Sequence, residues 1–329
     1  MKKHLLSTSA IALGVAMAAP VAAQEWDVSF GGFMSQHIAF TDNSVSTSLP
    51  GVDNDGFKIH SSSEVHFTPS ITLDNGLTFG VNIELEGENS PGSQIDESYM
   101  TISSDTLGRI VIGSENSAGY TLMTSAPVVT SMAINSPSIS SFIPFSAAYP
   151  GGFRQAGISS FTEVAGNNDA QRLTYYTPSF NGLTLGVSWA PDTSATNSYG
   201  LDRNSGVTDI FDIGVNYSQT FGTTSVTLSA RYGVGNMSNI AAGDPGVIGT
   251  VEIAPGVFED VYGPGTPAVV GSDPETWGVG AQVGFGAFAV GGSYAENDNG
   301  FAGGVGDSRG WNLGMTYDIA GPWALEAVT

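Results

Sequence analysis

The sequence contains no cysteine, which excludes disulfide-stapled scaffolds and thiolate metal centres. Basic residues are few: nine Lys and Arg stand against 31 Asp and Glu, so the chain would repel the phosphate backbone of a nucleic acid. Leu, Lys and Glu, the usual residues of helices, are scarce, whereas glycine accounts for 44 of 329 residues, about twice its ordinary share. This composition favours an all-β protein and argues against an α/β enzyme.

Long apolar runs are also missing beyond the N-terminus. The longest uncharged stretch, 116–153, is crowded with serine and interrupted by four prolines, so it does not predict a membrane-spanning helix. Residues 1–23 combine a basic start, an apolar run over 5–18 and small residues up to Ala23, which predicts a secretory signal peptide. An N-terminal membrane helix is the alternative, but the apolar run is too short to span a bilayer. Removing the signal peptide leaves 31 acidic and seven basic residues, a formal charge of −24 over 24–329.

The most informative pattern has a period of two residues. In 77–86 every odd-numbered residue is apolar and every even-numbered one is polar or glycine. The pattern recurs in 183–189, 211–217, 226–232, 277–285 and 311–319. Strands of about ten residues that are apolar on one face and polar or small on the other are typical of transmembrane antiparallel β-barrels, because one face meets lipid and the other meets water.

The strands of a soluble β-sandwich also alternate between apolar and polar residues, but their polar faces carry Lys and Glu toward solvent. Here the second face carries Gly, Ser, Thr and Asn. Aromatic residues also stand near the expected strand ends, where the headgroup region of a membrane favours them. They are Trp26, Phe40, Trp189, Phe221, Trp277, Phe285, Trp311, Tyr317 and Trp323. The sequence therefore predicts a transmembrane barrel rather than a secreted soluble protein.

Short and long connections alternate along the chain. Asp74-Asn75-Gly76 and Asn181-Gly182 predict tight turns, because Asn and Gly tolerate a positive φ. The long connections are 41–56, 87–94, 116–170, 191–208, 236–275 and 297–308. Short turns of such barrels face the periplasm and long loops face outward. Within 236–275, residues 249–262 predict a hairpin that projects above the barrel, and the alternative is two further wall strands.

At this point the chain resembles a known family, the trimeric 16-stranded general porins of Gram-negative bacteria, and especially those of alphaproteobacteria. The segments that carry the resemblance are DNGLTFGVNIELEGE (74–88), IDESYMTIS (95–103), GRIVIGSENS (108–117) and RLTYYTPSFNGLTLGVSWAPD (172–192). The resemblance implies an outer-membrane homotrimer, surrounded by lipid and lipopolysaccharide, through which small hydrophilic solutes and ions diffuse passively. It also implies that the third loop, 116–170, folds into the pore as a constriction.

Two features depart from the family pattern. The third loop carries only three charged residues, Arg154, Glu163 and Asp169, and the chain lacks the aromatic residue with which such barrels end. Thirteen strands can be counted from Trp26 onward, whereas a bacterial single-chain barrel has an even number. The sequence-based expectation is therefore that one to three C-terminal strands are missing, or one if 249–262 enters the wall. Strands 95–103 and 109–115, which are short and carry small residues, are the candidates for the subunit contact.

Successive side chains of a strand point to opposite faces, so odd and even positions (their parity) separate the lipid-facing residues from the candidate pore-lining ones. The basic ones are Lys58, Arg109, Arg172 and Arg231, and the acidic ones are Glu64, Glu84, Glu86, Glu97, Glu115 and Asp212. The resemblance implies that the basic set forms one side of a transverse field, and an ion pair between Arg231 and Asp212 is the alternative. The acidic excess predicts a preference for cations, since fixed charge of one sign concentrates counter-ions at a pore mouth.

Catalytic chemistry finds no support in the sequence. There is no Ser-His-Asp order, phosphate loop or cofactor fingerprint, so we expect neither an enzyme nor a cofactor. No metal site is predicted, because His60 and His66 are interpreted as wetted lining residues. Ca²⁺ bound by Asp53 and Asp55, or by Glu86 and Glu88, remains an alternative, although the spacing matches no calcium loop. The alternative functions are an adhesin with a plugged barrel and a barrel enzyme without an open pore.

Overall fold

The computed structural model describes residues 25–42, 55–87, 94–129, 164, 167–194, 203, 206–238, 247–254, 257–262, 271–300, 307–319 and 321–328. The predicted signal peptide lies outside these residues, as do Asp53 and Glu88 of the suggested calcium sites. Within the described part of the chain, no helix is both long and apolar enough to cross a membrane.

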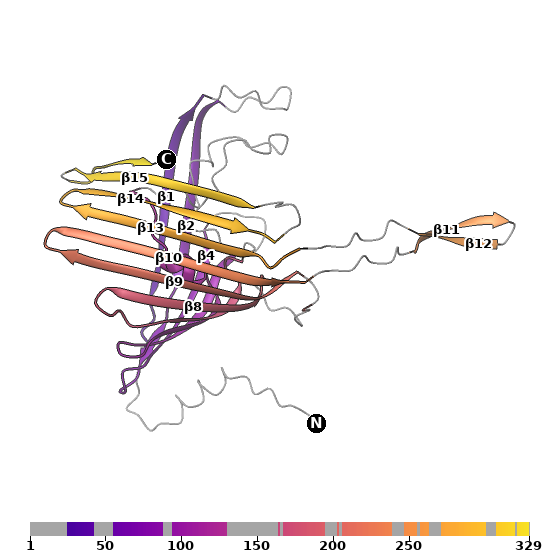
Figure 1. The fold of residues 1–329 in the computed structure, drawn as a ribbon, viewed down its shortest axis with the longest axis horizontal. Helices are drawn as coiled ribbons and strands as arrows, with labels where there is room; N and C mark the ends of the chain where they lie inside the picture. Colours follow the sequence, from indigo (N-terminus) through magenta and orange to yellow (C-terminus); the bar gives the residue numbers. More distant parts are fainter. Residues whose placement is uncertain are drawn as a thin grey trace.

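The structure is dominated by one antiparallel sheet of fourteen strands in which successive strands are neighbours (Figure 1). The strands are β1 (Phe30–Thr41), β2 (Gly56–Phe67), β3 (Ser70–Thr72), β4 (Thr78–Glu86), β5 (Ile95–Ser104), β6 (Gly108–Ser114), β7 (Gln171–Tyr176), β8 (Leu183–Asp192), β9 (Val207–Phe221), β10 (Thr224–Met237), β13 (Glu275–Phe285), β14 (Phe288–Asp298), β15 (Ser308–Asp318) and β16 (Ala324–Val328).

Two of these strands occupy one position in the wall. Glu64 of β2 faces Glu86 of β4, and Ser70 of β3 faces Gly80 of the same strand, so β2 and β3 share one register. The break between them falls at Pro69, which has no backbone N–H to donate to the ladder. Within the described residues the wall therefore has thirteen positions, as the sequence predicts.

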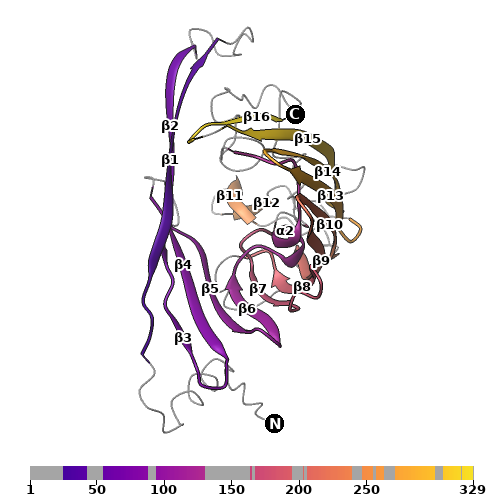
Figure 2. The same ribbon diagram turned by 90° about the vertical axis from the view of Figure 1, so that its left-hand side faces the viewer.

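The sheet curves into an incomplete ring, with β1 and β16 as its two edges (Figure 2). The strands alternate as a barrel wall requires. In β9, Ile210 and Asp212 are buried on the concave face, whereas Phe211 and Ile213 on the convex face are about half exposed. Large apolar side chains are exposed in this way along most of the wall, which is the reverse of a water-soluble protein and suits a convex face covered by lipid. The prediction of a transmembrane β-barrel is confirmed.

A separate two-stranded sheet projects from the wall between β10 and β13 (Figure 1). It consists of β11 (Val247–Ala254) and β12 (Val257–Tyr262), which pair with each other in antiparallel fashion. Neither strand pairs with a strand of the large sheet. The predicted projecting hairpin is confirmed, and the alternative of two further wall strands is wrong.

The start of the third loop lies inside the ring. It contains one short helix, α2 (Ala118–Leu122), which Figure 2 shows on the concave side of β7 to β10. Ser117 caps this helix, because its Oγ accepts a hydrogen bond from the Tyr120 amide at 3.2 Å. The predicted inward fold of the third loop is confirmed for its described residues.

Candidate functional site

Residues 115–129, which we call the strap, run across the concave face from β8 to β16. Four strap amides donate hydrogen bonds to side chains of the wall strands β8, β10, β15 and β16: Ala118 to Ser188 Oγ at 2.7 Å, Thr124 to Ser229 Oγ at 2.8 Å, Ala126 to Asn312 Oδ1 at 2.8 Å and Val129 to Glu326 Oε2 at 2.6 Å. Asn216 Nδ2 donates in addition to the Leu122 carbonyl oxygen at 2.9 Å. The strap is not a strand of the sheet, so polar side chains of the wall serve as the hydrogen-bond partners of these backbone amides in place of water.

Glycines of the wall make room for the strap. A Cβ at Gly214 of β9 would stand 2.5 Å from the Ala118 carbonyl oxygen, and one at Gly280 of β13 would collide with the Thr124 carbonyl oxygen. From the sequence alone, the small residues of this face indicate only a wide pore. The structure adds that part of this glycine content is the surface on which the strap lies.

Two predicted lining residues lie beneath the strap. Arg231 and Asp212 are only 4% and 3% exposed, and a Cβ at Gly119 of α2 would collide with the Asp212 carboxylate. Arg231 Nη2 donates to Thr276 Oγ1 of β13 at 3.1 Å. Both residues occupy the concave face, as parity predicts, but the helix covers them.

Arg172 anchors the returning end of the third loop. Its side chain is 4% exposed and donates hydrogen bonds to the carbonyl oxygens of Ala170, at 3.3 Å, and Asn167. Ser114 Oγ donates to the carbonyl oxygen of Asp169, which adopts a positive φ of 56°. Arg154 and Glu163, the other two charged residues of this loop, lie outside the described residues.

Lys58 and Arg109, the remaining basic candidates, lie toward opposite ends of the wall. Lys58 is the third residue of β2, close to the long connection 41–56, whereas Arg109 follows the short turn that ends at Gly108. The Arg109 guanidinium carbon sits 4.6 Å from the centre of the Tyr176 ring. The structure therefore does not bring the four basic candidates together into one cluster.

Three acidic candidates gather on β2 and β4 instead. Glu64 and Glu86 are direct cross-strand partners, and so are His66 and Glu84. His66 Nε2 lies 2.8 Å from Glu64 Oε2 and 3.8 Å from Glu84 Oε2. His66, Glu64 and Glu84 thus form a trio of half-buried side chains. The trio could not be found from the sequence, because the alternation of faces along each strand does not show which residue of β2 lies opposite which residue of β4.

Glu97 and Glu115 lie where the strap leaves the wall. Glu97 of β5 is 7% exposed and accepts a hydrogen bond from Asn116 Nδ2 at 2.5 Å. Glu115 follows β6 directly. Burial raises the pKa of Glu115 to about 7, against the opposing effects of hydrogen bonds from Tyr99 and the Asn116 amide. This carboxyl group can therefore change its charge near neutral pH.

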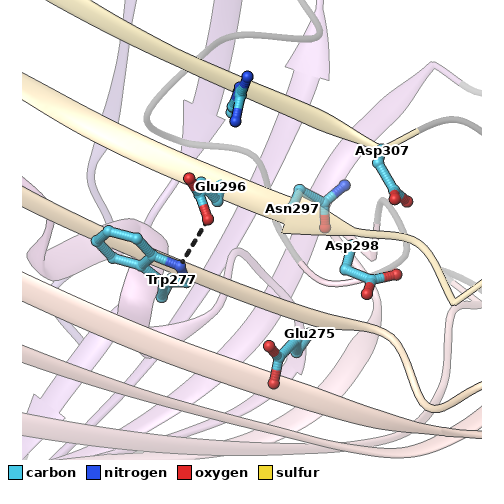
Figure 3. A pocket seen from close by; sticks show the side chains of 7 residues that line it. Glu275, Trp277, Glu296, Asn297, Asp298 and Asp307 are labelled. Atoms are coloured by element: carbon cyan, nitrogen blue, oxygen red, sulfur yellow. Dashed lines mark hydrogen bonds between the residues drawn. The ribbon is translucent and has the colours of Figure 1, made fainter. Parts of the chain in front are cut away.

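A pocket of about 410 Å³ opens on the convex side at the long-loop ends of β13 to β15 (Figure 3). It is lined by Glu275, Trp277, Glu296, Asn297, Asp298, Asp307 and Arg309. Trp277 Nε1 donates to Glu296 Oε2 at 3.2 Å, and the Trp277 and Tyr294 ring centres are 5.4 Å apart. Phe285, Phe288 and Tyr317 form a second aromatic group at the short-turn ends, with Phe288 and Tyr317 4.5 Å apart. The predicted aromatic belts are present at both ends of the strands.

A curved antiparallel sheet with an apolar convex face, two aromatic belts and a polar concave face crossed by an inward loop defines an outer-membrane β-barrel of the channel type. The sequence profile of the Gram-negative porin family matches residues 7–328, and the chain belongs to this family. It is an outer-membrane porin, a channel for the passive diffusion of small hydrophilic solutes and ions.

Solved structures of OmpT, with TM-scores above 0.5, confirm the fold. OmpT of Vibrio cholerae, an outer-membrane protein described in its trimer form, is 12% identical over 93% of this chain and 76% of its own length, with a TM-score of 0.53. Its loop L8 deletion mutant is 12% identical over 92% and 80% of the two chains, with a TM-score of 0.54. The anion-selective porin of Comamonas acidovorans is 16% identical over 92% and 87%, with a TM-score of 0.43. The comparison with curated protein sequences finds no match.

Proposed function

We propose that this porin prefers cations. The observation that carries the proposal is the unequal placement of charge on the concave face. Arg172 and Arg231 are almost fully buried and bonded to the backbone or wall, whereas Glu64 and Glu84 keep 18% and 15% of their side chains exposed. Charges that face a narrow aqueous passage act on passing ions with less screening than in bulk water. The half-buried glutamates of β2 and β4 therefore act on the passage, whereas two of the four basic candidates, Arg172 and Arg231, are covered.

The proposal is tested by comparing two variants with the same change in charge. E64Q/E84Q/E86Q removes three carboxylates from the concave face, and E275Q/E296Q/D298N removes three from the convex rim pocket. Reversal potentials under a KCl gradient across a planar bilayer should fall toward zero for the first variant and stay near wild type for the second. An equal change in both would assign the selectivity to overall charge, and no change in either would contradict the proposal.

We further propose that the protein acts without catalysis and without a plugged pore. Support comes from the position of the three histidines that follow the predicted signal peptide: all lie on β1 and β2, and His66 bonds to a carboxylate rather than to a nucleophile. Liposomes containing the protein should swell in small neutral sugars. Absence of both swelling and conductance in the refolded protein would favour an adhesin or a barrel enzyme.

Homotrimeric assembly is a third part of the proposal. It is supported by the trimer form of the Vibrio cholerae OmpT structure, which shares the fold. The candidate contact strands are β5 and β6, of which β6 spans only seven residues. Outer-membrane lipid and lipopolysaccharide are the proposed surroundings of the remaining convex face and its aromatic belts. Native mass in mild detergent should equal three chains, and a monomer that stays monomeric when lipid is added would contradict the assembly.

A further inference from the structure

We propose that His66, Glu64 and Glu84 form a binding site for a divalent transition-metal ion such as Zn²⁺ on the concave wall. His66 and Glu84 are direct cross-strand partners on β2 and β4. Glu64 stands two residues before His66 and therefore on the same face of β2. One ligand atom from each of the three side chains lies within 4.8 Å of the other two. Two adjacent strands thus supply three ligands to one point.

The distances suit a metal ion of this class. Zinc bonds to nitrogen and oxygen are about 2.0–2.2 Å long, so ligand atoms around a tetrahedral ion stand roughly 3.4 Å apart. His66 Nε2 lies 2.8 Å from Glu64 Oε2 and 3.8 Å from Glu84 Oε2, values on either side of that separation. Each of these two distances differs from the tetrahedral separation by only about 0.4–0.6 Å, an adjustment of the size that side-chain rotations supply.

The donor set decides which cation is expected. An imidazole nitrogen suits Zn²⁺ and its neighbours in the first transition row, whereas Ca²⁺ and Mg²⁺ prefer oxygen alone. Two carboxylates balance the double positive charge of the ion. Three protein ligands leave a fourth position for water, as in open zinc sites. The preference for imidazole separates this site from the calcium sites suggested by the acidic loops.

The surroundings hold one ligand in place and leave the site accessible. Asn82 Nδ2 donates to Glu84 Oε1 at 2.5 Å, which fixes the carboxylate with its other oxygen, Oε2, 3.8 Å from His66. Hydrogen bonds of this kind orient metal ligands from outside the coordination sphere. The His66, Glu64 and Glu84 side chains retain 26%, 18% and 15% of their exposure, so an ion can enter from the water-filled side.

Two neighbouring groups and an ion pair without metal are the three alternatives. Glu64 also lies within 4.8 Å of Glu86 and Asp96, an oxygen-only group that would favour a harder cation. On β1 and β2, His37 and His60 face each other with ring centres 6.3 Å apart, and they offer a pair of imidazoles. A simple ion pair between a protonated His66 and the two glutamates would need no metal. Each alternative predicts a different response to substitution.

The direct test is isothermal titration of the full chain, refolded in detergent and treated with EDTA, with ZnCl₂. The expected result is one tight Zn²⁺ site per chain that H66A and E84Q each weaken by at least about tenfold, and that N82A weakens by about tenfold. H37A/H60A, which removes two imidazoles from the same wall, is the matched control and should bind like wild type. The same titration with CaCl₂ should give much weaker binding.

Three outcomes would overturn the proposal: no tight Zn²⁺ site in wild type, loss of binding in H37A/H60A but not in H66A, or Ca²⁺ binding as tight as Zn²⁺. Because E84Q keeps the histidine and nearly the same shape, it decides the question if H66A fails to fold. Binding is measured without any conductance, so its failure is distinguishable from failure of the proposed channel function. In bilayers, micromolar Zn²⁺ should lower the cation preference of wild type and leave that of H66A unchanged.

Discussion

The backbone amide of Thr124 donates a 2.8 Å hydrogen bond to Ser229 Oγ, although the two residues are 105 positions apart in the chain. Ser229 is buried on the concave face of β10. Its hydroxyl oxygen is one of several wall groups that accept hydrogen bonds from backbone amides of the strap. The inward loop is therefore fastened to the wall at intervals rather than suspended in the passage. A constriction held in this way has a position determined by the wall strands.

Removing two of these fastenings should release the strap. In S188A/S229A, two strap amides lose their acceptors, and each buried unsatisfied donor costs about 1–3 kcal/mol. We expect faster proteolysis within 115–129 and noisier single-channel currents, with the barrel itself intact. S225A is the control, because Ser225 lies on the same face of β10 but near the short-turn end. Unchanged protease sensitivity in the double variant would show that the strap does not depend on these bonds.

A side chain at Gly280 should displace the strap. The nearest atom to a Cβ at this position is the Thr124 carbonyl oxygen, which belongs to backbone, whereas at Gly284 of the same strand it is the flexible Ser225 Oγ. We expect G280A to destabilise the strapped state by about 1–3 kcal/mol and to change single-channel conductance, with G284A close to wild type. Equal conductance in the two variants would contradict the idea that glycines accommodate the strap.

Glu115 should make the channel sensitive to pH near neutrality. Its pKa is raised to about 7, so between pH 4.5 and 7 the folded protein holds a proton that the unfolded chain releases. Stability should therefore decrease as pH rises through this window, by at most about 3 kcal/mol, and level off above it. The same ionisation adds negative charge beside the passage, so cation preference should increase from pH 5 to pH 8.

E115Q provides the check, because glutamine keeps the shape and does not titrate. Thermal unfolding and reversal potentials measured at pH 5, 6, 7 and 8 should show a smaller pH response than wild type. Identical pH profiles would remove Glu115 from the account.

The aromatic residues at the long-loop ends of the strands, such as Trp277 and Tyr294, should anchor the barrel at the outward-facing surface of the membrane. Trp277 is 36% exposed on the convex face, contacts Tyr294 and donates to Glu296. W277A should lower the free energy of unfolding in lipid vesicles by about 1–3 kcal/mol, because a large amphipathic ring is lost from the interface. W277F, which loses only the N–H, should cost about 1 kcal/mol. Urea unfolding that ranks the two variants equally would contradict the anchoring role.

Much of the wall could be predicted from the sequence, because lipid on one face and water on the other impose a period of two residues on every strand. The alternation around Phe211 and Asp212 placed both residues on their correct faces. Parity could not show that α2 covers Asp212 and Arg231, because the packing of a loop against the wall is a long-range contact that the pattern of a single strand does not encode. Nor could it show that His66 lies opposite Glu84, because the register depends on how the chain passes Pro69. The projecting hairpin 249–262 was predictable because each half is too short to span a membrane.

The selectivity of the wild-type channel tests the central claim most directly. Its reversal potential should be measured under KCl gradients centred near 0.1 M and near 1 M across a planar bilayer. The account predicts a clear cation preference at the lower concentration that weakens at the higher one, because the screening length falls from about 10 Å to about 3 Å. Anion preference at low salt would mean that the arginines outweigh the half-buried glutamates of β2 and β4, and would contradict the account.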